Sequence, residues 1–378
     1  MITVYFSLAA IFLTAAVVSV GNGLLQTFLP VRMQIEGFTT AQIGAVVTAH
    51  AIGFLVSCLV MPRIIRAVGH TRCMLGCALV LAIVMPLFPL TSWWPLWFVL
   101  RLLAGCCLAG LFVAIESWIT DRAPMQMLGA VYGSYFIISK LTFSGGQLLL
   151  ATFDPAGIGP FLAIAACFVV TLVPVSLNPG QRPTMPDRQS YGLDKVFAAS
   201  PLAVTGACTA GFVYASANGV GPVFATVVGF GTAAIAWFAA LIQLGNVVSQ
   251  YPLGWLSDRV DRRRMMLAIG IGTAILCLIF LAVPRDEVAL LLLLAALLGG
   301  IGTSIYPLAL GRVAARVEKR NLVGLNGTLL LCFAAGGIAG PATSTVAMTW
   351  LGPYGLFVAI GAATSAFALH CLWRLFRR

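Results

Sequence analysis

The chain has 378 residues, of which 60% are hydrophobic and only 9% charged, and its mean hydropathy is +1.01. This composition excludes an ordinary soluble domain and indicates a protein that lies within a membrane. The formal net charge of +11 would suit a polyanionic partner, so the positions of the basic residues decide what the charge means.

Apolar stretches, each long enough to cross a hydrocarbon core of about 30 Å as a helix, follow one another along the whole chain. Twelve are expected, at residues 5–29, 40–61, 73–91, 94–119, 128–151, 158–177, 201–225, 232–256, 265–284, 288–311, 323–346 and 353–373. No soluble domain fits between them. We therefore predict an all-α polytopic membrane protein with twelve transmembrane helices.

The basic residues lie mostly on one side of this predicted topology. If the N-terminus is cytoplasmic, the inner loops and the C-terminal tail hold 18 of the 22 Lys and Arg residues. By the positive-inside rule, both termini are then expected in the cytoplasm. The positive charge therefore reports topology and contact with membrane lipids, and no nucleic-acid partner is expected.

The sequence offers no pattern for an enzyme, a cofactor or a metal. It has no phosphate loop, dinucleotide fingerprint or nucleophile elbow. The ten cysteines have no spacing suited to a disulfide framework or zinc, and the three histidines are far apart in the predicted topology. We expect no catalytic residue, no cofactor and no metal ligand.

The second half of the chain repeats the first. A shift of 192 residues places Pro30 on Pro222, Gly37-Phe38 on Gly229-Phe230, Thr40-Ala41 on Thr232-Ala233, Ile43 on Ile235 and Gly53 on Gly245. Between the halves lies a segment rich in Pro and polar residues. We therefore expect an N-terminal six-helix bundle at 1–177, a cytoplasmic linker at 178–200 and a C-terminal six-helix bundle at 201–378.

The loop "GWLSDRVDRRR" at residues 254–264 resembles the signature of the major facilitator superfamily, which is a Gly, then Asp-Arg, then a basic cluster. The matching positions are Gly254, Asp258, Arg259, Arg262 and Arg263. Asp261 stands where a Gly is usual. "RLLAGCC" is similar to the superfamily's fourth-helix pattern, in which an Arg precedes a Gly by four residues, as Arg101 precedes Gly105.

Two further stretches, "FVLRLLAGCCLAGLFVAIES" and "YPLALGRVAARVEKRNLVGLNGTLLL", look most like the bacterial YcaD-type group of that superfamily. The resemblance covers most of the chain. It implies a multi-pass transporter of the bacterial inner membrane, with two pseudo-symmetric bundles and a substrate site between them near the middle of the membrane. It leaves the substrate open.

Gating residues are expected at the cytoplasmic ends of the helices. In the second half they are the five signature positions, where contacts of Asp258 would shift the equilibrium between inward-open and outward-open states, while the arginines would also anchor the loop to anionic lipid. The first-half copy of the loop has lost the acid. The resemblance implies that Glu116 replaces it, with Arg63 or Arg66 as its partner; the alternative is that Glu116 is a proton or substrate site.

Charged groups within the spans are costly and point to a functional cavity. Arg101, Lys140 and His50 lie inside predicted spans of the first half, with no nearby acid to pair with them. We expect Arg101 and Lys140 to attract a carboxylate or phosphate on the substrate, helped by His50 when it is protonated. The alternative is that Arg101 bonds Asn22, Gln26 or backbone carbonyls, and that Lys140 extends its amine towards the membrane surface or is neutral when no substrate is bound.

Uncharged polar residues in the spans complete the predicted substrate cavity. Asn22 and Gln26 share one helical face, and the 192-residue shift places them on Tyr214 and Asn218. The remaining cavity candidates are Gln147, Gln243 and Asn246, and Gln250 extends the stripe of the last two. Such residues can instead hold helices together by hydrogen bonds, so both roles stay open.

The predicted function is secondary transport of a small organic solute by rocker-switch alternating access. An anionic substrate and proton coupling are the specific hypotheses, with Glu116, His50 and Lys140 as the candidate proton carriers. The alternatives are efflux of hydrophobic compounds, a lipid flippase and a sensor of the same fold that transports nothing.

Overall fold

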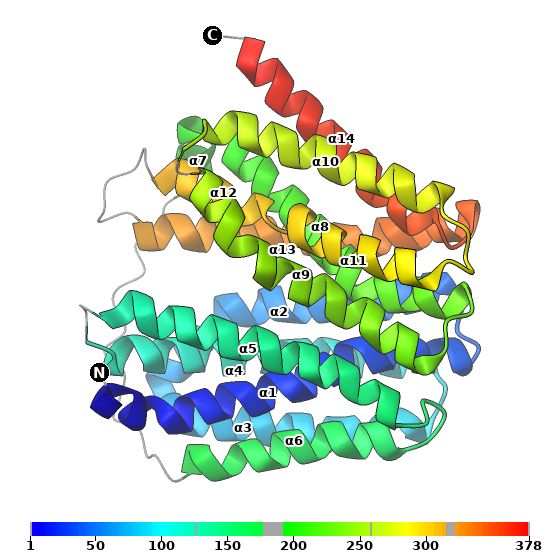
Figure 1. The fold of residues 1–378 in the computed structure, drawn as a ribbon. Coiled ribbons are helices and arrows are strands. Elements are labelled where there is room, and N and C mark those ends of the chain that lie inside the picture. Colours follow the sequence, from blue (N-terminus) through cyan, green and yellow to red (C-terminus); the bar gives the residue numbers. More distant parts are fainter. Residues whose placement is uncertain (1, 125–126, 177–191, 258, 315–321, 377–378) are drawn as a thin grey trace. The chain divides into compact units, whose positions relative to one another are not determined.

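The computed structural model describes residues 2–124, 127–176, 192–257, 259–314 and 322–376 (Figure 1). Within these ranges the regular structure is helical throughout and contains no strand. The predicted all-α membrane fold is confirmed.

The chain divides into two compact units. The first unit comprises residues 1–38 and 49–186, and the second comprises residues 39–48 and 187–378, so the first turns of α2 group with the second unit. The predicted linker at 178–200 lies mostly outside the described residues.

Helices of the first unit pack mainly as the pairs α1 with α5, α1 with α6, α3 with α4 and α3 with α6. Their bounds are α1 Ile2–Ile35, α2 Thr40–Val68, α3 His70–Val84, η1 Met85–Leu90, α4 Trp94–Arg122, α5 Leu128–Leu149, η3 Leu150–Thr152 and α6 Gly159–Ser176.

Helices of the second unit pack mainly as the pairs α8 with α13, α9 with α11 and α10 with α14. Their bounds are α7 Leu193–Ala199, α8 Pro201–Val227, α9 Thr232–Ser257, α10 Arg262–Ala282, α11 Val288–Gly302, α12 Ile305–Ala314, α13 Leu322–Leu351 and α14 Gly355–Phe376.

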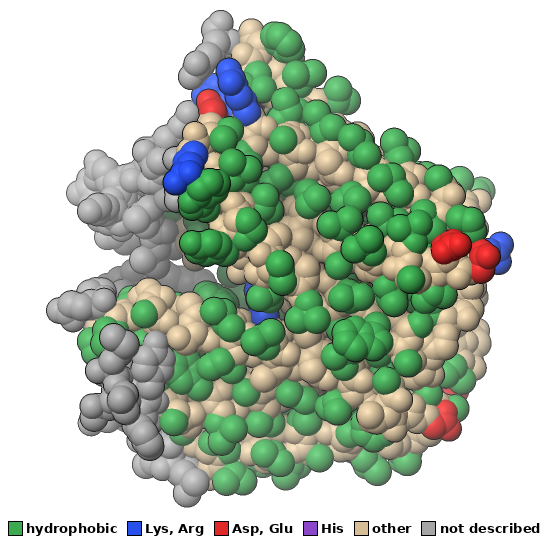
Figure 2. Space-filling view, in the orientation of Figure 1, with side chains coloured by type: hydrophobic (Ala, Val, Ile, Leu, Met, Phe, Trp, Pro, Cys, Tyr) green, Lys and Arg blue, Asp and Glu red, His purple; other side chains and the backbone are tan. Residues whose placement is uncertain are grey.

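Ten helices in the described part of the chain are long and apolar enough to cross a membrane, and eleven if the bent pair of α7 and α8 counts as one span. Each of the twelve predicted ranges contains a helix. The fifth range, which forms α5, is not among the ten. Figure 2 shows hydrophobic side chains over the face in view, with most of the visible charges towards the helix ends.

The sequence repeat is visible in the turns that end α1 and α8. Gly37 and Gly229 both have a positive φ, 79° and 92°. In the first turn, Phe38 N donates to Met33 O and Gly37 N to Gln34 O; in the second, Phe230 N donates to Ala225 O and Gly229 N to Thr226 O. All four pairs obey the 192-residue shift. This is a Schellman ending, in which glycine supplies the left-handed residue.

Glycines also set the helix crossings in both units. A Cβ added to Gly23 of α1 would lie 2.0 Å from the Phe143 carbonyl oxygen of α5, and one added to Gly211 of α8 would lie 1.8 Å from that of Phe333 in α13. Backbone contact this close is possible only without a side chain, so small residues draw these helix pairs together. The pairs α1–α5 and α8–α13 are equivalent in the two repeats.

Two details differ from the predicted elements. The range 288–311 is one predicted helix, but it breaks at Thr303 and Ser304, whose hydroxyls bond the carbonyls one turn back. Pro307 follows the break and has no N–H for the carbonyl four residues earlier, which accounts for the interruption. Within the predicted linker, residues 193–199 form α7, which meets α8 at an angle of 111°.

At the end of α1, Arg32 fastens the helix to the loop before α6. Its guanidinium donates to the carbonyls of Pro155, Ala156 and Gly157 and lies 2.6 Å from Glu36 Oε1. Ser92 donates to the other Glu36 oxygen at 2.5 Å. The pKa of the Glu36 carboxyl lies below its ordinary value, first because of the Ser92 hydrogen bond, with partial burial opposing the shift and Arg32 adding to it.

We expect Glu36→Gln to lower the melting temperature at neutral pH and to have no effect in acid. A carboxyl whose pKa falls on folding stabilises the protein above its unfolded-state pKa, and this contribution disappears as the pH falls through the folded-state value. Thermal melting of both proteins from pH 7 to about pH 3 measures the difference. Glu287→Gln, before α11, is the control, because Glu287 makes no side-chain capping bond. A difference independent of pH would contradict the assignment.

Candidate functional site

A buried polar cluster joins three helices of the first unit: Gln26 of α1, His50 of α2 and Arg101 of α4. Glycines bring α2 and α4 together beside it. A Cβ on Gly53 would lie 2.1 Å from the Leu102 carbonyl oxygen, and one on Gly105 would lie 2.4 Å from that of His50. His50 and Arg101 each stand about one turn before a crossing glycine, so this contact holds them in place.

Hydrogen bonds connect the cluster in series. Arg101 Nη2 donates to Gln26 Oε1 at 2.6 Å, and Gln26 Nε2 lies 2.8 Å from His50 Nε2. Arg101 is 1% exposed, yet its Nε and Nη1 have no hydrogen-bond partner, and neither does the buried Nδ1 of His50. The described residues contain one ion pair, Arg32 with Glu36, so the buried guanidinium has no carboxylate beside it.

More unsatisfied polar atoms lie along the contact between α1 and α5. The side chain of Gln147 is 0% exposed, and neither its oxygen nor its nitrogen has a partner. The backbone nitrogen of Gln147 would lie 3.2 Å from a Cβ added to Gly23 of α1. The residue before Gly23 is Asn22, and its side-chain oxygen is also buried without a partner. Lys140 stands two turns earlier on α5 and is partly exposed. Leaving such groups unpaired costs about 1–3 kcal/mol each, which favours an external polar partner.

The polar residues predicted in the second half form a ladder within the second unit. On α8, Asn218 donates to the Tyr214 carbonyl one turn earlier. Asn246 donates to Thr303 Oγ1, beside the break between α11 and α12, and accepts from Gln250 at 3.4 Å. The side-chain oxygens of Asn218 and Gln243 remain buried without a partner. These hydrogen bonds therefore tie α9 to the end of α11, and Asn218 and Gln243 still offer two acceptors.

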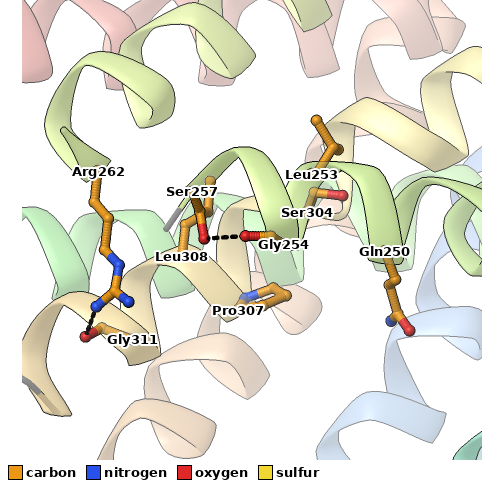
Figure 3. Close-up of a pocket in the computed structure, with 9 residues that line it drawn as sticks. All are labelled: Gln250, Leu253, Gly254, Ser257, Arg262, Ser304, Pro307, Leu308 and Gly311. Atoms are coloured by element: carbon orange, nitrogen blue, oxygen red, sulfur yellow. Dashed lines mark hydrogen bonds between the residues drawn. The ribbon is translucent and has the colours of Figure 1, made fainter. Parts of the chain in front are cut away.

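A cavity of about 340 Å³ opens next to this ladder, between α9, α10 and the region of α12 (Figure 3). Two of the signature residues, Gly254 and Arg262, line it. Arg262 Nη1 donates to the Gly311 carbonyl, and Gln250 lies at the opposite end of the cavity in the view of Figure 3.

The other signature residues surround the start of α10. Arg259 stacks over Trp255, 3.7 Å from the ring centre. Asp261 caps α10 by accepting from the Arg263 backbone N–H at 2.7 Å, which explains an acid at the position where the superfamily usually has Gly. Asp258 lies outside the described residues, so its predicted gating contacts stay a prediction.

Glu116 lies against α5 of the first unit. Its Oε1 accepts from Tyr135 at 3.4 Å, and its backbone oxygen accepts from Tyr132 at 2.9 Å. The predicted partners Arg63 and Arg66 donate to carbonyls of their own helix, those of Leu59 and Pro62. The arginine pairing of Glu116 is therefore not formed in this structure, and its gating role stays a prediction. The two tyrosines were not expected from the sequence.

The family and the fold are shown by comparison with known proteins. A model described as the Major Facilitator Superfamily matches residues 11–242 and 203–378. An uncharacterized MFS-type transporter of Yersinia enterocolitica is 23% identical, with 94% of this chain and 92% of that protein covered. The uncharacterized MFS-type transporter YcaD of Escherichia coli is also 23% identical, with 92% and 90% covered.

Solved structures agree on the fold. The crystal structure of the nucleoside transporter NupG has a TM-score of 0.79 at 14% identity and covers 98% of this chain and 99% of its own. A bacterial homolog of the human lysosomal transporter Spinster, inward-facing and unoccupied, has a TM-score of 0.74 at 14% identity, with 97% and 95% covered. The family match spans both halves of the sequence, and the chain therefore belongs to the major facilitator superfamily of membrane transporters.

Proposed function

We propose that the chain is a secondary transporter that carries a small organic anion across the bacterial inner membrane by alternating access of its two halves. The observation that supports this proposal is the buried guanidinium of Arg101, which has two unpartnered nitrogens and no carboxylate beside it. A cation buried within a membrane-spanning helix requires compensation, and an anionic substrate supplies it.

The chemistry of the first-unit cluster favours an oxygen anion. Guanidinium N–H groups arranged in a fork bind carboxylate or phosphate with two parallel hydrogen bonds. The free Gln147 amide and Asn22 oxygen would accept from, or donate to, hydroxyl groups on the same molecule. Lys140 on α5 is the second cation within the predicted spans of this half and would add attraction for the anion.

A neutral nucleoside is the second candidate, since the fold resembles that of the nucleoside transporter NupG. The second unit supports this alternative through its aromatic and amide groups: Tyr214 and Tyr306 both lie against Phe333, with ring centres 5.8 and 5.2 Å apart. A nucleobase would stack on such rings. It would leave the Arg101 charge unused, so the anion is preferred.

A ligand-stabilisation screen on the purified protein tests the proposal. We expect gluconate, succinate or inorganic phosphate to raise the melting temperature, because a ligand at a hundred times its Kd stabilises by about 2.7 kcal/mol. Uridine, glucose and ethidium represent nucleosides, neutral sugars and hydrophobic cations. Stabilisation by one of these three, with none by the anions, would contradict an anionic substrate. Transport of the stabilising anion into proteoliposomes then separates a transporter from a sensor that only binds.

A further inference from the structure

The hydrogen-bond directions within the first-unit cluster are fixed by chemistry. A guanidinium has only donors, so the Gln26 atom 2.6 Å from Arg101 Nη2 has to be the amide oxygen. The amide nitrogen therefore faces His50 Nε2 at 2.8 Å, and an amide nitrogen can only donate. His50 Nε2 is then the acceptor, and the imidazole is neutral with its proton on Nδ1.

Gln26 cannot satisfy Arg101 and a protonated His50 together. A proton on His50 Nε2 would place two donors against each other across the 2.8 Å contact. Turning the amide over would give His50 an acceptor, but it would set the amide N–H₂ against Arg101 Nη2 across the 2.6 Å contact. Arg101 therefore keeps His50 neutral through Gln26 as long as Arg101 itself depends on the Gln26 oxygen.

An anion at Arg101 removes this constraint. When an oxygen of the anion accepts from Arg101 Nη2, the Gln26 amide is free to turn and present its oxygen to His50. A proton from water can then bind His50 Nε2 and donate to that oxygen. The charge of the cluster is the same before and after, since one negative charge and one proton enter together, and a constant charge avoids the cost of burying a second net charge.

We propose that His50 is the proton site of this transporter and that Gln26 is the switch that makes proton binding depend on anion binding. This inference rests on the proposed function and refines it: a monoanion, such as a hydroxylated monocarboxylate, enters together with one proton, and the cycle moves no net charge. The anion and the proton bind to adjacent side chains on α1, α2 and α4. Their coupling therefore needs no conformational change that extends to a distant site.

The charged and titratable groups near His50 are few. Arg101 from α4 is the charged side chain that acts on it. Cys106, also on α4, donates its thiol to the Gly53 carbonyl one turn along α2. Glu116 is fifteen residues beyond Arg101 in the sequence, about 22 Å along the helix. Lys140 belongs to α5, which packs on α1.

Nitrogen NMR of the full-length protein, labelled with ¹⁵N-histidine, tests the switch without any substrate. The His50 signal is identified by its absence from the spectrum of His50→Asn. In the parent protein at pH 7 we expect it to be that of a neutral imidazole with its proton on Nδ1. In Gln26→Glu the same ring should be doubly protonated, because the new carboxylate offers one oxygen to Arg101 and the other to His50. An Nε2-protonated neutral ring in the parent protein, or an unchanged ring in Gln26→Glu, would overturn the proposal.

Proteoliposomes with a trapped pH dye test the coupling with gluconate, succinate and inorganic phosphate as probes. Entry of the transported monoanion should acidify the interior by one proton per anion, and clamping the membrane potential should not alter the rate. His50→Asn should lower anion-driven acidification at least tenfold, whereas His370→Asn, in the second unit, should preserve it. Anion entry without proton entry, or coupling retained in His50→Asn, would refute the proton site alone. Failure of all three probes to enter would instead contradict the proposed function.

Discussion

Replacing Arg101 with alanine is expected to reduce anion transport at least tenfold. Each hydrogen bond to a charged group contributes about 1.5–3 kcal/mol, which corresponds to one to two orders of magnitude in affinity. Arg101→Lys keeps the charge but loses the planar fork, so we expect it to recover only part of the activity. Counterflow of labelled gluconate, succinate and phosphate in proteoliposomes measures the loss.

Arg285→Ala is the matched control, because Arg285 belongs to the second unit, in the loop before α11, and is not part of the first-unit cluster. It should transport at the rate of the parent protein. The Arg101 variants also need a melting temperature close to that of the parent, so that loss of transport is not loss of fold. Undiminished anion transport by a folded Arg101→Ala protein would remove the basis of the anion proposal.

The second large effect is expected at the crossing of α8 and α13, where Gly336→Ala should destabilise the protein. Its Cβ would lie 1.9 Å from the Cys208 carbonyl oxygen, so the two helices would have to separate. Overpacking of this kind costs about 1–3 kcal/mol, and rigid backbone on both sides leaves little room to adapt. Thermal melting and gel filtration of the purified variant give the measurement.

Gly327 lies on the same helix and gives a sharp comparison. A Cβ there would have no atom within 4 Å, so Gly327→Ala should be neutral or stabilising, because alanine favours a helix by about 1 kcal/mol over glycine. Equal melting temperatures for the two variants would show that the close crossing is not needed for stability.

Much of the fold could be predicted because membrane spans and a tandem repeat leave strong marks in a sequence. The sequence match of Gly37 with Gly229 corresponds to equivalent turns, since glycine adopts their backbone angles most readily. The break at Thr303 and Ser304 was missed, although Pro307 inside the predicted span is the signal that could have revealed it. The capping role of Asp261 was likewise readable from an acid placed directly before a helix.

The members of the candidate site could be named from the sequence, but their contacts could not. Arg101, His50 and Gln26 were candidates because each is a polar residue within an apolar span. Their connection into one series depends on the rotation and depth of three helices, which no single stretch of sequence encodes. The glycines Gly53 and Gly105 account only for the crossing of α2 with α4. The bond from Arg101 to Gln26 was the alternative to anion binding; it occupies Nη2 and leaves Nε and Nη1 without a partner.

The partners of Glu116 were missed for a different reason. Tyr132 and Tyr135 are aromatic residues in an apolar stretch, and such residues ordinarily face lipid or neighbouring helices. Only the packing of the start of α5 against the end of α4 shows that their hydroxyls meet Glu116.

The interruption between α11 and α12 has no counterpart in the described residues of the first half of the chain. In the first repeat the corresponding helix, α4, is continuous from Trp94 to Arg122. In the second repeat the helix is interrupted at Thr303 and Ser304, and Asn246 of α9 donates a hydrogen bond to Thr303. A helix bends more easily where its backbone hydrogen bonding is interrupted, so we expect this helix of the second unit to bend more readily than α4 of the first.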